Sequence, residues 1–254
     1  MKKAKRIFCT VVILILILVV VAIAIVALNL DTIVKKGVET VGPQITKVSI
    51  KLDAVHISLL NSSIKMNGLV VGNPEGYRAP DAINASTIAI GVNPFSLSSE
   101  KIVVRSIKVE APEITFEGGL GGNNLSKIMD NVNGPTKQTG LVITNSVESP
   151  KSGKKIEVDD LLITGAKVHA IVTDMGGKEI TLTLPDIHLI DLGKGNDGLT
   201  PTDLTRAVLK AIISATVKAV TSEATRLSGK GAELLKDNGS VNKIKKGIGG
   251  LLGK

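Results

Sequence analysis

Beyond residue 44, apolar and polar residues alternate along most of the chain. Ile, Val and Leu take every second position, with Lys, Ser, Thr or Asp between them. This period of two is typical of antiparallel β-strands that bury one face and expose the other. The pattern therefore predicts a mainly β body.

The alternation changes phase in a repeated way. In five places, two apolar residues at alternate positions are followed by two more in the opposite phase, within 50–57, 64–71, 102–109, 156–163 and 182–189. Such a change turns the apolar set to the other face unless the strand holds an extra residue. A β-bulge supplies that residue and bends the strand. We expect a curled, bulged antiparallel sheet, a half-barrel or groove, and chance recurrence in a Val- and Ile-rich chain is the alternative.

Other segments interrupt or extend this sheet. Residues 86–95 predict one more strand, and 174–177 (Asp-Met-Gly-Gly) a hairpin turn. A short helix is expected over 123–132, capped by Asn123 or Asn124. The pattern apolar-x-x-apolar-x-apolar at 104–109 recurs 54 residues later at 158–163, which favours a weak internal repeat.

A long helix is predicted after Thr200. Thr200 is a suitable N-cap, Pro201 suits the first turn, and Asp203 completes a capping pattern. Apolar residues then recur at helical spacing as far as Val220, and Gly229 is a natural end. We expect this helix to pack on one apolar face of the sheet, with a detachable lid over a lipid groove as the alternative.

The N-terminal part is of a different kind. Ile7 to Leu28 is a run of 22 residues without a charge, Gly or Pro, and about 20 apolar helical residues span a bilayer. Lys2, Lys3, Lys5 and Arg6 precede the run. The excess of positive charge predicts a cytoplasmic N-terminus and a body on the other side of the membrane. A cleaved signal peptide is the alternative, although its apolar region is usually shorter.

The net charge of +8 is divided between the two ends. Residues 1–28 and 230–254 each carry +4, and the body between them is neutral. One Tyr, three Phe and no Trp leave few rings for stacking on bases. Charge and composition thus argue against a nucleic-acid partner.

The C-terminal tail, residues 229–254, combines basic side chains with apolar residues at helical spacing. This pattern suits an anionic membrane surface, although four glycines disfavour a helix, and docking onto the body or disorder is the alternative. The membrane-surface candidates are Lys243, Ile244, Lys245, Lys246, Ile248, Leu251 and Leu252.

Catalytic and metal-binding motifs are missing from the sequence. There is no Gly-x-Ser-x-Gly, no His-Glu-x-x-His and no phosphate-binding loop. The single Cys excludes an intrachain disulfide. Asp186, His188 and Asp191 are too dispersed around a turn to predict a metal site, and Asp159-Asp160 falls at an expected bulge. We therefore expect no enzyme activity, no catalytic residues, no metal and no cofactor.

Several of these features together resemble the AsmA-like family of bacterial envelopes. A positive stub and an apolar span precede Gly68–Tyr77, which contains Asn-Pro-x-Gly-aromatic. A strand ending Glu113–Glu117 and the turn Gly122–Leu125 follow in the same order. The resemblance covers 1–133, the N-terminal AsmA module, and 154–228 is similar to the closing unit of short members.

This resemblance implies a non-enzymatic, single-pass inner-membrane protein with a periplasmic body. Like the repeating-β-groove and TamB-related proteins, it would bind or pass lipid acyl chains in phospholipid transport or outer-membrane homeostasis. The expected partners are membrane lipids and other envelope proteins. The lipid-groove candidates are Val55, Ile57, Leu69, Val71, Ile107, Val109, Leu161, Ile163, Ile187 and Leu189.

Two other functions fit the same pattern. An envelope interaction or scaffold module would have a filled core, and a water-stress (LEA-2-like) β-sandwich would have two closed sheets. The expected organisation is a cytoplasmic stub (1–6), a transmembrane helix (7–28), an AsmA-like β module (30–133), a flexible loop (134–153), a second β hairpin with the long helix (154–228) and a basic tail (229–254).

Overall fold

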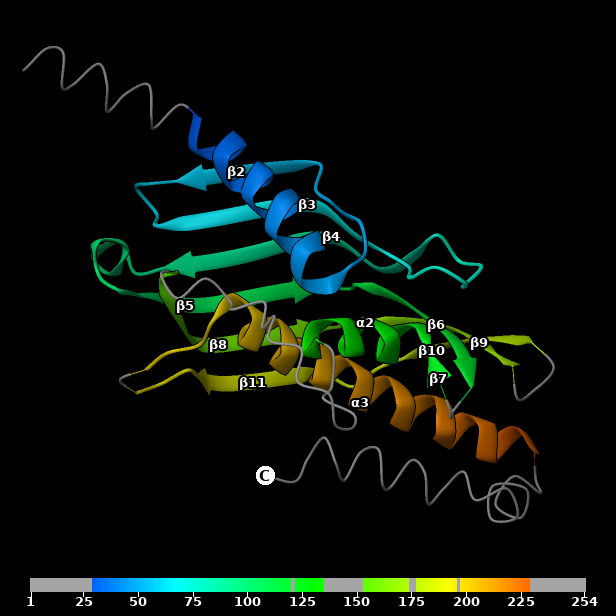
Figure 1. The fold of residues 1–254 in the computed structure, drawn as a ribbon. Helices are drawn as coiled ribbons and strands as arrows, with labels where there is room; N and C mark the ends of the chain where they lie inside the picture. The colour runs from blue at the N-terminus through cyan, green and yellow to red at the C-terminus, as the bar shows by residue number, and fades with distance from the viewer. Residues whose placement is uncertain (1–28, 120–121, 135–152, 174–176, 196, 229–254) are drawn as a thin grey trace, which may run out of the picture.

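The computed structural model describes residues 29–119, 122–134, 153–173, 177–195 and 197–228. Its eleven strands form one sheet, which is curled and carries helices on one face (Figure 1). The predicted mainly β fold with a C-terminal helix on the sheet is confirmed. Because all described strands share one sheet, the sandwich alternative is wrong.

Several strands continue one another across a break. They are β1 (Ile50–Lys51), β2 (Ala54–Ser58), β3 (Ser63–Gly72), β4 (Asp81–Val92), β5 (Lys101–Glu110), β6 (Glu113–Gly119), β7 (Gly122–Asn123), β8 (Lys155–Thr164), β9 (Lys167–Val172), β10 (Lys178–Thr183) and β11 (Ile187–Leu192). β1 and β2 both pair with β3, and β5 and β6 both pair with β4. The main sheet is therefore a row of six kinked ribbons in chain order: β1/β2, β3, β4, β5/β6, β8/β9 and β10/β11.

One neighbouring pair of ribbons is parallel. Lys101 lies beside Lys155 and Glu113 beside Lys167, so both β5–β8 and β6–β9 match residues 54 positions apart. The 54-residue spacing in the sequence is thus the register of this pair, and the expectation of a purely antiparallel sheet is wrong here. Parallel neighbours require a crossover connection, and α2 (Asn124–Asn133) lies within it.

The breaks lie in one line across the sheet. Pairing is interrupted once in each ribbon, for one to three positions, while the register on both sides stays the same. The aligned positions within these interruptions are Asp53, Gly68, Ser86, Ala111, Gly165 and Pro185. We call this line the crease. Gly68, Ala111 and Gly165 have positive φ values of 63°, 45° and 62°. The expected bulges within 50–57, 64–71 and 182–189 are therefore wrong in form, because a kink without an inserted residue bends the ribbon there.

A second, shorter line contains a true bulge. Gly91 pairs with Ser106, but Val92 pairs with Val104, so Arg105 is an extra residue in β5. The bulge predicted within 102–109 is confirmed. Pairing between β8 and β11 also skips Asp159 and Asp191, and Asp191 has a φ of 55°. The register is the same on both sides of this skip, so the bulge predicted within 156–163 is wrong in form.

The predicted helices are present. α2 is capped by Asn123, whose side chain accepts a bond from the Ser126 amide. α3 (Pro201–Ser228) begins after Thr200. The Thr200 hydroxyl accepts a hydrogen bond from the Asp203 amide and donates one to the Asp203 carboxylate. The hairpin between β9 and β10 is also confirmed, since Lys178 pairs with Val172.

Two local predictions need correction. The strand expected at 86–95 starts earlier, at Asp81, and ends at Val92; Pro94–Ser98 forms the short 3₁₀ helix η1. Residues 29–46, for which the sequence analysis gave no helix, are helical. We call this segment the N-terminal helix.

The N-terminal helix protects the sheet edge formed by β1 and β2. Asp31 and Glu39 accept bonds from the Ile57 and Leu52 amides at 3.0 Å each, and the Lys35 ammonium donates to the Asp53 carbonyl at 2.9 Å. Residues four apart lie on one helix face, so a single stripe makes all three bonds. Unpaired edge groups invite pairing with other chains, and this stripe occupies them.

Among the described residues, the structure contains no helix with both the length and the apolar character needed to cross a membrane. The predicted span at 7–28 and the basic tail at 229–254 lie outside those residues.

Candidate functional site

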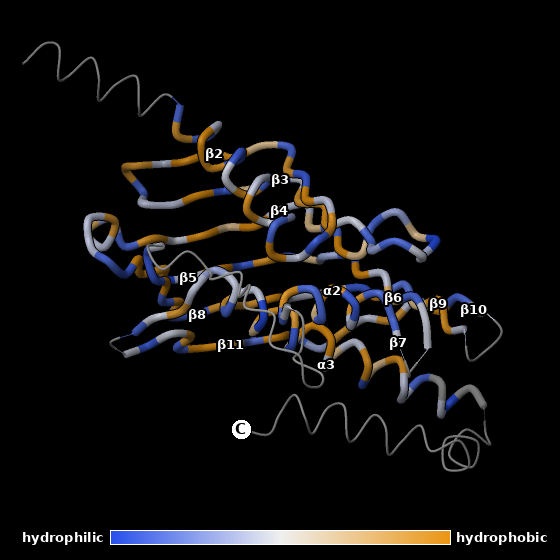
Figure 2. The backbone as a smooth tube through the Cα atoms, viewed as in Figure 1, coloured by the Kyte–Doolittle hydropathy of each residue, from blue (hydrophilic) through white to orange (hydrophobic). Residues whose placement is uncertain are grey.

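The register aligns the aliphatic residues into rows across the sheet. The first row joins Ile57, Ile64, Ile90, Ile107, Leu161 and Leu189. The second joins Val55, Met66, Ile88, Val109, Ile163 and Ile187. Because directly paired residues point to the same face, each row is a continuous aliphatic stripe. Figure 2 shows apolar stretches along much of the sheet.

A third row lies on the other side of the crease. It joins Ile50, Val71, Ile83, Ile114, Val168 and Leu182. Ile114 and Val168 belong to the same buried cluster as Leu161 and Ile163. The crease therefore keeps the apolar residues on one face although the sequence changes phase.

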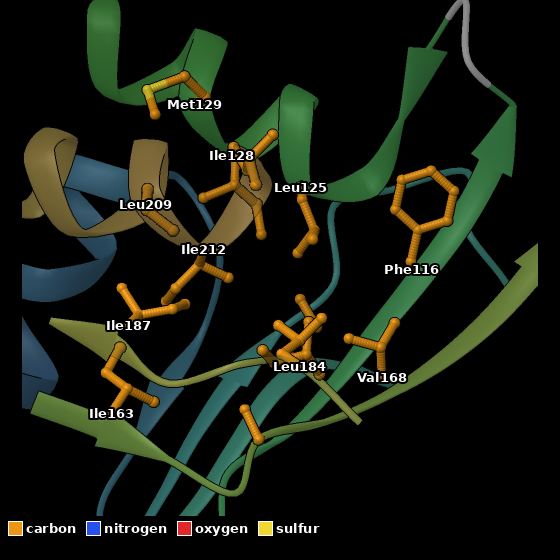
Figure 3. Packing of buried hydrophobic residues seen from close by; sticks show 14 of the residues in the cluster. Phe116, Leu125, Ile128, Met129, Ile163, Val168, Leu184, Ile187, Leu209 and Ile212 are labelled. Atoms are coloured by element: carbon orange, nitrogen blue, oxygen red, sulfur yellow. The ribbon is translucent and has the colours of Figure 1, made fainter. Parts of the chain in front are cut away.

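Helices fill one half of this face, which we call the packed half: β6, β8, β9 and β11 beneath α2 and α3. Leu125 and Ile128 of α2 and Leu209 and Ile212 of α3 are buried in one cluster with residues of these strands. Figure 3 shows side chains of both helices directed towards Val168, Leu184 and Ile187 of this half. The packed half is an ordinary close-packed core.

The β2–β5 part of the first two rows is less covered, and we call it the open half. Val55 and Ile88 are buried there, but most members of these rows are only half-buried; the half-buried ones are Ile57, Ile64, Met66, Ile90, Ile107 and Val109. The N-terminal helix crosses in front of β2 to β4, and α2 and α3 lie over the other ribbons (Figure 1). The open half thus offers aliphatic surface that the N-terminal helix covers only in part.

The structure places eight of the ten predicted groove residues in the two halves and two beyond the crease. Leu161, Ile163 and Ile187 are buried in the packed half, and Leu189 is packed against that core. Those in the open half are Val55, Ile57, Ile107 and Val109, of which Ile107 and Val109 also pack against that core. Leu69 and Val71 lie beyond the crease, paired with Ala85 and Ile83. All of the membrane-surface candidates, from Lys243 to Leu252, lie outside the described residues.

The predicted motifs around Asn73, Glu117 and Asn124 meet in one buried network. Glu117 is 6% exposed, and its carboxylate accepts bonds from the Arg78 and Ala79 amides at 2.8–2.9 Å. The Asn124 amide donates to Asn73 Oδ1 and to the Thr115 carbonyl, and its oxygen accepts from the Glu117 amide. We call this network the clasp, because it fastens the 73–80 loop to β6 and α2.

The clasp also affects a nearby tyrosine. Partial burial, followed by the negative charges of Glu117 and Asp130, raises the pKa of Tyr77 above its ordinary value. The phenol is therefore neutral throughout the physiological range.

Two of the residues considered for metal binding, His188 and Asp191, have partners within the protein. His188 Nε2 lies 2.5 Å from Asp160 Oδ1, a contact that the sequence analysis missed because it depends on the β8–β11 register. Asp191 pairs with Lys194 at 2.8 Å, and His169 contacts Thr181 at 3.2 Å across β9 and β10.

The N-terminal helix is the main feature that sequence reasoning missed. Its signal was nevertheless present: Asp31, Lys35 and Glu39 recur every four residues, and Leu30, Val34 and Val38 do the same. This spacing is typical of an amphipathic helix. The sequence analysis instead assigned residues from 30 onwards to the β module.

Comparison with models of known protein families matches residues 1–186 to the AsmA family. The matched range extends past the first six strands and includes β8, β9 and β10. No curated protein and no solved structure matches the chain.

Proposed function

Because this chain belongs to the AsmA family, we propose that it is a non-enzymatic envelope protein that binds lipid acyl chains along the open half of its sheet. Its anchor is the apolar run at 7–28, with the N-terminus in the cytoplasm and the body in the periplasm. The bound lipid serves phospholipid transport or outer-membrane homeostasis, with the protein acting as a carrier or adaptor.

One observation carries the proposal: two aliphatic rows continue from a filled core into half-buried positions. Ile64, Ile90 and Ile107 are neighbours in the first row, and none of them is fully buried. Each Å² of apolar surface removed from water stabilises a complex by about 25 cal/mol. An acyl chain laid across these ribbons would bury side chains that the helices leave partly exposed.

The chemistry of the open half supports an apolar ligand rather than a reacting one. Its rows consist of Ile, Val and Met, and the charged residues next to the row members, Lys65, Lys108 and Glu110, have the opposite parity. Lys65, for example, pairs with Ala89, and Ala89 with Lys108, and all three are exposed. The polar groups of the clasp are already bonded to one another. We therefore propose no catalytic role, no metal and no cofactor.

In-cell photocrosslinking of the full chain tests this function. A photoreactive amino acid replaces Ile64, Ile90 or Ile107 in turn, and extracted adducts are analysed for phospholipid. Lys65, Ala89 and Lys108 are matched controls, because they occupy the same strands but face the other way. We expect lipid adducts at the three isoleucine positions and few at the controls. Equal labelling of both sets would contradict the proposal.

A scaffold function is the second candidate, and the packed half favours it. The buried cluster under α2 and α3 is filled by side chains of the protein itself. If the isoleucine positions crosslink to a protein instead of a phospholipid, the interaction module becomes the better description.

A further inference from the structure

Two neighbouring turns expose large apolar side chains at one end of the sheet. In the β2–β3 turn, Leu59 is 61% and Leu60 99% exposed; in η1, Phe95 is 86% and Leu97 49% exposed. The Val92 amide donates to the Ser62 carbonyl at 2.8 Å, which holds the two turns side by side. We call these four residues the apolar tips.

In both turns, polar side chains are bonded internally and apolar side chains face solvent, the reverse of the usual arrangement in a surface loop. In η1, the buried Ser96 hydroxyl donates to the Asn93 carbonyl at 2.6 Å and accepts the Val103 amide at 2.9 Å. Phe95 and Leu97, on either side of Ser96, point outward instead. Turns normally carry Gly, Asn, Asp or Ser at their exposed positions, and exposed apolar clusters mark interaction surfaces.

The β2–β3 turn is built in the same way. The Asn61 amide donates to the Ser58 hydroxyl at 3.3 Å, and the Ser62 amide donates to the Leu59 carbonyl at 3.3 Å. Polar side chains and backbone groups thus fix the turn. Nothing in its internal bonding requires leucine side chains at positions 59 and 60, so their apolar character needs another explanation.

The apolar tips lie beside the start of the N-terminal helix. Asp31 bonds to the Ile57 amide, one residue before the end of β2, and Glu39 bonds further back at Leu52. The helix therefore runs antiparallel to β2, and Asn29 is about 3 Å of helix rise from Asp31. In Figure 1 both turns and this end of the helix lie at the same side of the sheet. The apolar run 7–28 joins the body here.

We propose that the apolar tips insert into the bilayer that holds the apolar run, so that this end of the sheet rests on the membrane. This inference uses the membrane anchoring of the proposed function, but not the binding of acyl chains by the open half. The partner of the apolar tips is a lipid surface, because a chain that enters a membrane immediately beside Leu59 and Leu60 brings both turns to the headgroup region. Aliphatic and aromatic side chains are well suited to that boundary.

Docking would fix the sheet relative to the membrane at two places, the anchor and the tips. The open half begins next to the tips, since Ile57 and Ile64 flank the β2–β3 turn. An acyl chain leaving the bilayer would therefore meet the first aliphatic row directly. Docking thus gives the proposed lipid path an entrance.

Site-specific fluorescence of the full chain in phospholipid vesicles tests the docking. Cys9, the only cysteine, is replaced by Ser, and an environment-sensitive dye is attached to Leu60→Cys, Phe95→Cys or Glu75→Cys. Glu75 is the control, because it is exposed in the 73–80 loop at the opposite end of β3. We expect blue-shifted emission and quenching by nitroxide lipids at positions 60 and 95, and neither at position 75. Equal signals at all three positions would overturn the proposal.

A charged variant provides a second measurement. Leu60→Asp combined with Phe95→Asp changes only exposed side chains, so folding is expected to be retained. The dye at Leu97→Cys should then lose its quenching by nitroxide lipids, and unchanged quenching would count against docking. If this loss occurs while lipid still crosslinks at Ile64, docking and acyl binding are separable. If crosslinking fails but quenching persists, the proposed function is wrong and the docking stands.

Discussion

The two halves of the sheet have the same aliphatic chemistry but different coverage. Ile163 in the packed half lies under α2 and α3 and is 3% exposed, whereas Ile64 in the open half is half-buried. Both belong to rows that cross the sheet without interruption. The difference shows that a row of apolar residues does not decide whether a face becomes a core or a binding surface. Whether helices cover that row decides which of the two it becomes.

The largest expected contrast comes from truncating one isoleucine in each half. Ile163→Ala should lower the free energy of unfolding by about 3–4 kcal/mol, because it leaves a cavity in a closed core. Ile64→Ala should cost only about 1–2 kcal/mol, since part of its surface already contacts water. Denaturant unfolding of the full chain in mild detergent, followed by circular dichroism, measures both. Equal losses would show that the open half is as tightly packed as the other.

A glycine substitution tests whether the crease is equally constrained in the open half. Gly68→Ala should destabilise the protein by about 3 kcal/mol, because positive φ strains a residue with a Cβ and Asp53 occupies the space. An added Cβ would lie 2.0 Å from Asp53 Oδ2. Gly76→Ala is the control: its φ is also positive, but nothing lies within 4 Å of the added atom. We expect about 1 kcal/mol there, and a similar loss at both positions would indicate that the crease relaxes freely.

The clasp tests how firmly the packed half holds its flanking loop. Asn124→Ala removes three hydrogen bonds and leaves buried partners unsatisfied, for which we expect a loss of about 2 kcal/mol. Asn131→Ala, in the same helix, removes one bond to the Thr46 carbonyl and should cost less. Thermal unfolding of the two variants distinguishes them. If Asn124→Ala is no worse than its control, the clasp does not stabilise the packed half.

The smallest effect concerns the start of α3, which covers the packed half. The Thr200 hydroxyl bond, followed by Arg206, holds the pKa of Asp203 below its ordinary value of 3.8. A depressed folded-state pKa gives stability that is present above pH 4 and is lost as the pH falls below it. Thr200→Val should cost about 1 kcal/mol at neutral pH.

The same variant should weaken the loss of stability on acidification, because the Asp203 pKa returns towards its ordinary value. Unfolding midpoints of the wild type and of Thr200→Val, measured between pH 3 and pH 7, report this loss of stability. Thr205→Val on the same helix is the control, since its hydroxyl bonds only to the Pro201 carbonyl. Identical acid profiles for wild type and Thr200→Val would contradict this role of the cap.

Local physics made much of the fold predictable. The alternation at 50–57 and 182–189 indicated strands, and the phase changes indicated bends on one continuous apolar face. The caps at Asn123 and Thr200 set where α2 and α3 begin. Each of these signals depends on residues within a few positions of one another, so the sequence contains them completely.

Apart from the N-terminal helix itself, whose signal is local, the misses depend on contacts between distant residues. Edge protection by Asp31 and Glu39 requires β2 to lie along the N-terminal helix, and the His188–Asp160 pair requires the β8–β11 register. The kink at Gly68 was mistaken for a bulge, because both devices produce the same phase change. Pairing across the sheet distinguishes them.

The sequence by itself determined the strands, their apolar face, the caps and a spacing of 54 residues. Only the tertiary structure decided that this spacing is a parallel register and that the kinks align into one crease. It also decided that α2 and α3 close one half of the face and leave the other half partly exposed. The physical reason is that period and capping are local properties, whereas coverage of an apolar row depends on where the chain places its helices.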